Sequence, residues 1–154
     1  MFRLSRLHRL RRLHLPGRVK GDQAGPYGSV TLFKSGDASL DFVSKLELLE
    51  QLDVGGLGVS DLKPLSGLHK LTRLRLTWNA GVTDLSALDA LPALEVLELT
   101  GTSASILPTL AKATRLRRVE LSGNESPASI AAMVAAHKGM SCDGTLCEVP
   151  FQMQ

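Results

Sequence analysis

The stretch "LHKLTRLRLTWNAGVTDLSAL", residues 68–88, has leucines spaced three, three and two residues apart just before the only tryptophan of the chain. The complete pattern is a ladder of five apolar residues with spacing three, three, three and two. Its copies run over Leu4–Leu15, Val43–Val54, Leu65–Leu76, Leu88–Leu99 and Leu110–Leu121. Between residues 43 and 121 successive copies are 22 or 23 residues apart, and so regular a period indicates a repeat protein.

The spacing within each copy predicts its local structure. The last two ladder residues alternate with the period of a β-strand, whereas the preceding spacing of three suits a 3₁₀-like or extended return segment. One such coil cannot bury its own leucines. Stacking it on its neighbours completes a continuous aliphatic core and pairs the strands of successive coils in parallel.

The pattern resembles the leucine-rich repeat family, specifically the short bacterial, internalin-like type. The resemblance is carried by residues 68–88, by "LPALEVLELTGTSASILPTL" at residues 91–110, and by the return segments "VSDLKPL" and "VTDLSAL". The turn asparagine of the family is matched at Asn79 and Asn124. The resemblance implies an α/β solenoid, a right-handed superhelix of about seven coils with parallel strands on its concave side.

We expect one domain over residues 1–154, with regular repeats at 43–124 flanked by weaker coils at 4–42 and a cap at 125–154. A weak copy through Val30 and Leu32 predicts a strand between those of the first and second full copies. At the other end, "SPASIAAMVAAHKG" predicts a helix that starts after Ser126, and "MSCDGTLCEV" predicts a hairpin turning at Asp143-Gly144.

Residues that alternate with the buried strand positions should face the concave side, where this family usually binds partners. Trp78 follows the strand by two positions, where the other copies have glycine or lysine, so we expect it to be displayed rather than buried. The alternative is a local lid over Leu57 or Ala80-Gly81. The candidate partner-binding residues are Phe33, Gln51, Asp53, Arg73, Arg75, Trp78, Glu98, Arg118 and Glu120.

The charges on this face have two interpretations. Arg73, Arg75 and Arg118 could meet an acidic partner, or they could pair with acidic residues on neighbouring strands. Acidic residues on the same face would repel phosphates, which disfavours nucleic acid as the partner. The first twenty residues hold seven Lys or Arg and no acidic residue. We favour a first coil for this segment over a targeting or membrane-binding helix, because it repeats the ladder.

This sequence has few residues that could form a catalytic or metal-binding site. The four histidines are spread along the chain, and His137, Cys142 and Cys147 offer three metal ligands where a structural zinc site needs four. We therefore expect no enzyme activity, no cofactor and no metal. Cys142 is at a ladder position, which favours a buried thiol over a disulfide with Cys147. With no apolar run long enough to span a membrane, a cytoplasmic location is the default expectation.

The predicted function is non-catalytic recognition of a specific protein partner on the concave face, as an inhibitor, an immunity protein or an adaptor. The alternative is a structural subunit that docks through its basic first coil or associates with itself. Oligomeric state, the identity of the partner and whether the chain is part of a longer repeat protein stay open.

Overall fold

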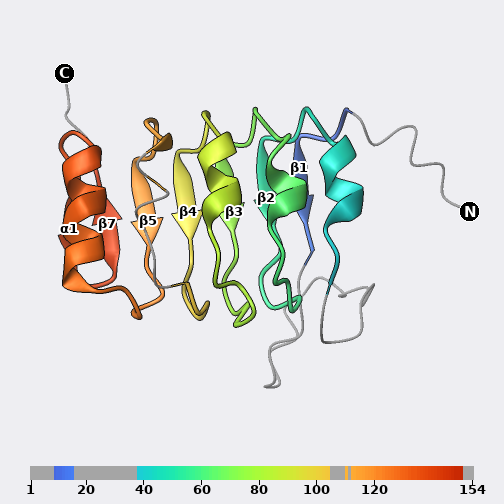
Figure 1. The fold of residues 1–154 in the computed structure, drawn as a ribbon. Coiled ribbons are helices and arrows are strands. Elements are labelled where there is room, and N and C mark those ends of the chain that lie inside the picture. Colours follow the sequence, from blue (N-terminus) through green and yellow to red (C-terminus); the bar gives the residue numbers. More distant parts are fainter. Residues whose placement is uncertain (1–8, 16–37, 105–109, 111, 151–154) are drawn as a thin grey trace, which may run out of the picture.

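A computed structural model describes residues 9–15, 38–104, 110 and 112–150 of the chain. Its parallel strands lie side by side in one layer, and short helical segments form a second layer in front of them (Figure 1). The strands in parallel are β1 (Arg12–His14), β2 (Gln51–Asp53), β3 (Arg73–Arg75), β4 (Val96–Glu98) and β5 (Arg118–Glu120). The second layer includes the 3₁₀ helices η2 (Asp41–Lys45), η3 (Lys63–Leu65) and η4 (Ser86–Ala90).

The leucine ladder forms the core between the two layers. Every ladder position from Val43 to Leu121 is buried, and none is more than 4% exposed. In the return segments the backbone N–H of one ladder residue donates to the carbonyl of the ladder residue three positions earlier. Leu65, Leu68 and Leu71 form one such chain, with N···O distances of 2.9 Å. The spacing of three in the sequence therefore corresponds to 3₁₀-type hydrogen bonds that keep successive leucines on the inner side.

The order of the strands differs from the prediction at one point. β1 pairs directly with β2 in parallel, with Leu13 opposite Leu52, so no strand from residues 29–33 lies between them. β2 occupies the hydrogen-bonding edge of β1. The N–H of Gln51 donates to the carbonyl of Arg11, and the N–H of Leu15 donates to the carbonyl of Asp53. Residues 16–37, including the weak ladder copy and Phe33, lie outside the described residues. Within the basic segment, residues 12–14 form strand β1 at one end of the parallel sheet.

Both elements expected after the last repeat are present. Helix α1 (Pro127–Ala136) begins at Ser126, whose hydroxyl accepts the N–H of Ser129, and strands β6 (Ser141–Asp143) and β7 (Leu146–Glu148) form an antiparallel hairpin. β7 also pairs antiparallel with β5, so the hairpin extends the sheet. Among the described residues, no helix is long and apolar enough to cross a lipid bilayer.

The structure also differs from the prediction at the two cysteines. Cys142 and Cys147 form a disulfide instead of remaining free thiols. The hairpin places them directly opposite each other on β6 and β7, with their Cα atoms 4.0 Å apart. The ladder position of Cys142 favoured a buried thiol, but the turn brings two residues five positions apart face to face.

Asn79 holds the turn after β3 and links it to the preceding coil. Its side chain is fully buried; Nδ2 donates to the carbonyls of Leu76 at 2.9 Å and Val54 at 3.0 Å. Its Oδ1 accepts the backbone N–H groups of Gly58 and Val59, each at 2.9 Å. The predicted turn role of Asn79 is confirmed. Asn124 is exposed, and its side chain donates one such bond, to the carbonyl of Thr102.

We expect Asn79→Ala to lower the free energy of unfolding by at least about 3 kcal/mol, because it leaves several buried backbone groups without partners. Asn124→Ala is the matched control and should cost about 1 kcal/mol, since a single, partly buried hydrogen bond is lost. Urea denaturation followed by circular dichroism measures both. Equal losses for the two variants would contradict the assignment of Asn79 as the residue that links the coils.

The disulfide has a direct chemical test. Unreduced, denatured protein treated with iodoacetamide should take up no carbamidomethyl group, and protein reduced beforehand should take up two. Intact-mass spectrometry distinguishes these cases. Two labelled cysteines without reduction would show that the thiols are free in the protein as isolated.

Candidate functional site

The outer face of the parallel sheet, which we call the sheet face, carries most of the candidate residues in two rows. The strand register fixes both rows, because residues opposite each other on neighbouring strands lie side by side. The first row is Arg12, Gln51, Arg73, Val96 and Arg118. The second row is His14, Asp53, Arg75, Glu98 and Glu120. The structure thus brings seven of the nine predicted residues onto one face; Trp78 lies apart, and Phe33 is outside the described residues.

Side chains of the second row contact one another across neighbouring strands, from His14 to Glu98. The Nδ1 of His14 lies 2.6 Å from the Oδ2 of Asp53, and the same carboxylate lies 3.4 Å from Arg75 Nη1. Arg75 then reaches Glu98 on the next strand, with 3.0 Å between Nε and Oε2. The interpretation that these charges pair across strands is confirmed for Arg75. Such exposed pairs each contribute about 0–1 kcal/mol, so they set the pattern of charge more than they stabilise the fold.

Arg118, at the far end of the first row, is also paired. Its Nη2 lies 2.8 Å from Glu120 Oε1 and its Nη1 lies 3.7 Å from Glu148 Oε2. The hydrogen bond to Glu120 raises the pKa of Arg118 above its ordinary value. Arg118 is therefore a neutralised cation at the β5 and β7 end of the sheet face.

Arg12 and Arg73 differ from these arginines. Both side chains are exposed, and neither has a carboxylate within ion-pair distance among the residues that the structure describes. They flank Gln51 in the first row, over a hollow of about 290 Å³. The hollow is lined by Arg12, Leu13, His14, Gln51, Leu52, Asp53, Arg73, Arg75 and Glu98. The sequence identified Arg73 as a candidate but not its pairing with Arg12, because that depends on β1 lying next to β2.

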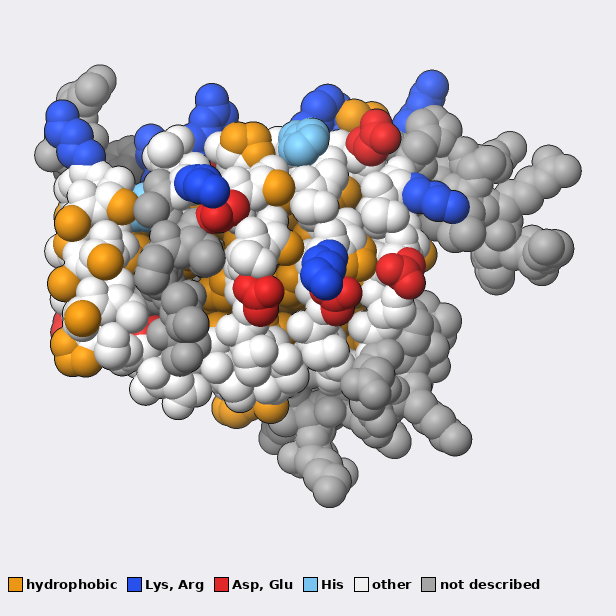
Figure 2. Space-filling model, viewed as in Figure 1, with side chains coloured by type: hydrophobic (Ala, Val, Ile, Leu, Met, Phe, Trp, Pro, Cys, Tyr) orange, Lys and Arg blue, Asp and Glu red, His pale blue; other side chains and the backbone are white. Residues whose placement is uncertain are grey.

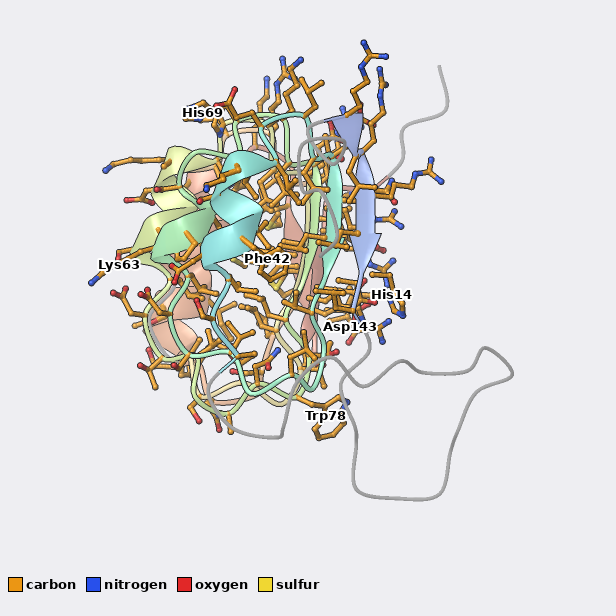
Figure 3. The ribbon with its side chains drawn as sticks, turned by 90° about the vertical axis from the view of Figure 1, so that its right-hand side faces the viewer. His14, Phe42, Lys63, His69, Trp78 and Asp143 are labelled. Atoms are coloured by element: carbon orange, nitrogen blue, oxygen red, sulfur yellow. A yellow bond between two sulfur atoms is a disulfide. The ribbon has the colours of Figure 1, made fainter. Side chains whose placement is uncertain are left out.

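Trp78 lies at the turn where the chain leaves β3, beyond the end of the strands (Figure 3). It is 59% exposed, and among the described residues it is the one large hydrophobic side chain with such exposure. A Cβ atom added to Gly101 on the next coil would lie 2.6 Å from Cε3 of the indole, so the ring packs directly over that glycine. Trp78 is thus displayed as predicted, and it packs toward Gly101 rather than over Leu57.

The backbone of Trp78 is unusual. Its φ is +60°, in the left-handed region, and the matching positions in other coils are Gly56, Gly101 and Gly123, whose φ values are 68°, 74° and 86°. Glycine adopts this conformation freely, whereas another residue pays roughly 1–2 kcal/mol. The tryptophan therefore occupies a turn position that is built for glycine.

The opposite face, formed by the 3₁₀ helices, shows acidic and basic side chains interspersed where it is visible in Figure 2. His69 and Lys63 lie on this side of the molecule, away from His14 (Figure 3). His137 is buried under α1, where its ring nitrogens lie 2.7 Å and 3.1 Å from the carbonyls of Met133 and Ala113. Within the described ranges, no three His, Cys, Asp or Glu side chains come together as a metal site.

Solved structures with the same arrangement are bacterial leucine-rich repeat proteins. An internalin from Listeria monocytogenes (inlF) is 31% identical, with a TM-score of 0.57 over 64% of this chain and 30% of its own. An internalin C2 from the same species is 24% identical, with a TM-score of 0.54 over 62% of this chain and 43% of its own. A leucine-rich repeat protein from Leptospira interrogans is 25% identical, with a TM-score of 0.52 over 60% of this chain and 25% of its own.

Comparison with family models gave no match, and no curated protein matched. The ladder, the parallel sheet and the structural neighbours together define the class: this is a leucine-rich repeat solenoid. Within that class its repeats are similar to those of bacterial leucine-rich repeat proteins such as internalins, as the sequence indicated. The chain spans less than half the length of each of these neighbours. The class is one of protein-interaction modules and is typically non-catalytic.

The contact between Trp78 and Gly101 can be tested by fluorescence, because the chain has a single tryptophan. We expect Gly101→Ala to displace the indole and shift its emission to longer wavelength. Gly123→Ala is the control, since it shares the positive φ but its added Cβ meets only Thr145 Cγ2, at 3.9 Å. Both variants should lose about 1–2 kcal/mol of stability. An unchanged emission for Gly101→Ala would mean that the indole does not pack on Gly101 in solution.

Proposed function

We propose that the chain binds a specific protein partner through the sheet face and the adjoining Trp78, and that it does so without catalysis. The observation that carries this proposal is Trp78, an exposed indole on a backbone conformation that would suit glycine better. A residue that is strained and exposed is not explained by folding stability, so a binding role is the better account. Tryptophan and arginine are also residue types enriched at interaction hot spots.

The size and chemistry of the sheet face support a protein partner. Parallel strands about 4.8 Å apart give five strands a width on the order of 20 Å, and β7 adds to it, which suits a protein interface. Asp53, Glu98 and Glu120 lie along its second row and would repel the phosphates of a nucleic acid. A compact module with one such face would serve as an inhibitor, an immunity protein or an adaptor.

We further propose that α1 and the β6–β7 hairpin act as a cap at one end of the leucine core. Met133, Met140 and Cys147 are buried in the same apolar cluster as the ladder leucines. The antiparallel pairing of β7 with β5 departs from the parallel stacking of the repeats. The disulfide between β6 and β7 joins the two strands of this cap. The cytoplasmic location expected from the absence of a long apolar run stays a prediction.

The test is capture of a partner from a lysate of the source organism on the immobilised chain, with identification by mass spectrometry. We expect Trp78→Ala to reduce the yield of the captured partner at least about tenfold, because a hot-spot side chain contributes 2 kcal/mol or more. Lys63→Ala, on the opposite face, is the matched control and should bind as the unmodified chain does. Circular dichroism checks that both variants are folded. Undiminished capture by Trp78→Ala would refute the role of this residue.

A further inference from the structure

We propose that Arg12 and Arg73 form a clamp for a carboxylate side chain of the protein partner, seated over Gln51. The inference rests on the proposed function, since it names the chemistry of the partner on the same face. It begins from the division of the sheet-face arginines into two kinds. Arg75 and Arg118 are each bonded to acidic side chains, whereas Arg12 and Arg73 have no such partner within the described part of the chain.

The acidic residues nearest to this pair are already in use. Asp53 contacts His14 and Arg75 through Oδ2, and its Oδ1 accepts the backbone N–H of Gly55 at 3.0 Å. Glu98 contacts Arg75. Both carboxylates are therefore engaged by second-row side chains, and among the described residues neither lies within ion-pair distance of Arg12 or Arg73. The hollow has three arginines in its lining against two carboxylates, so it can take one more negative charge.

The spacing of the clamp suits one small anion. Arg12 and Arg73 are on strands β1 and β3, with β2 between them, which separates their Cα atoms by about 10 Å at ordinary strand spacing. Long arginine side chains on both sides can converge over the intervening strand. Gln51, at the centre, adds an amide that can donate to the same anion. A planar carboxylate matches the fork of a guanidinium group and accepts two parallel hydrogen bonds from it.

The surroundings of the clamp favour a carboxylate over a phosphate. Asp53 and Glu98 lie in the lining of the same hollow, and their repulsion grows with the charge of the ligand. A carboxylate carries one negative charge, whereas a phosphate monoester carries nearly two at neutral pH. We therefore assign the ligand as an Asp or Glu side chain of an acidic segment in the partner.

The test uses a defined probe and needs no identified partner. A fluorescein-labelled hexaglutamate peptide with blocked ends is titrated with the full chain, and its anisotropy is measured. Hexaglutamine and a phosphoserine peptide of equal length are the comparison probes. We expect hexaglutamate to bind most tightly of the three. Binding of hexaglutamine with equal affinity, or tighter binding of the phosphoserine peptide, would overturn the assignment of a carboxylate.

Three single variants show whether the clamp is responsible. Arg12→Gln and Arg73→Gln should each weaken hexaglutamate binding by at least about fivefold, as expected for loss of a charge-assisted hydrogen bond. Lys63→Gln changes the net charge by the same amount on the opposite face of the molecule, so it should change the affinity less than about twofold. Equal losses in all three would show that only overall charge matters, which would refute the clamp.

The outcome also separates this inference from the function on which it rests. If Trp78→Ala loses the captured partner while Arg12→Gln and Arg73→Gln retain both the partner and hexaglutamate, the clamp is wrong and the recognition function stands. If the two arginine variants lose hexaglutamate while Trp78→Ala retains the captured partner, the clamp stands and the role of Trp78 is wrong. All variants alter exposed side chains, so circular dichroism should show unchanged folding.

Discussion

Each coil of this chain carries an apolar row that it cannot bury alone, and every other feature of the structure depends on the stacking that buries it. The ladder from Val43 to Leu121 lies between the sheet and the 3₁₀ layer, with its strand residues in register across neighbouring coils. A shift of one residue would turn the buried leucines outward, so burial fixes the register. That register in turn sets which charged side chains become neighbours on the sheet face.

The sheet face shows how a fixed register divides residues of one kind into different roles. Arg73 and Arg75 are two positions apart on β3, yet Arg75 lies between Asp53 and Glu98, whereas Arg73 lies between Gln51 and Val96. One is therefore neutralised by its neighbours, and the other has no carboxylate within ion-pair distance among the described residues. Their chemistry is identical, and only the residues on β2 and β4 distinguish them. The ion pairs contribute little stability, so their main effect is to define where unpaired charge remains.

Trp78 occupies a turn position at which neighbouring coils have glycine. The turn after each of these strands uses the left-handed conformation, and glycine fills it at 56, 101 and 123. Gly101 also has the space that the indole needs, because any side chain there would collide with the ring. A glycine on the next coil thus permits the tryptophan to lie against the solenoid with most of its surface exposed. Two adjacent coils together present this side chain.

The sequence by itself determined the leucine core, the 3₁₀ return segments, the turn role of Asn79, the terminal helix and hairpin, and the exposure of Trp78. These features follow from periodicity, hydrogen-bonding capacity and turn chemistry, which are local properties. The tertiary structure alone decided that β1 pairs with β2 and that Arg12 and Arg73 share a hollow. Those outcomes depend on contacts between distant segments, or on the competition of several carboxylates for the same arginines. The spacing of residues along the sequence indicates neither the contacts between distant segments nor this competition.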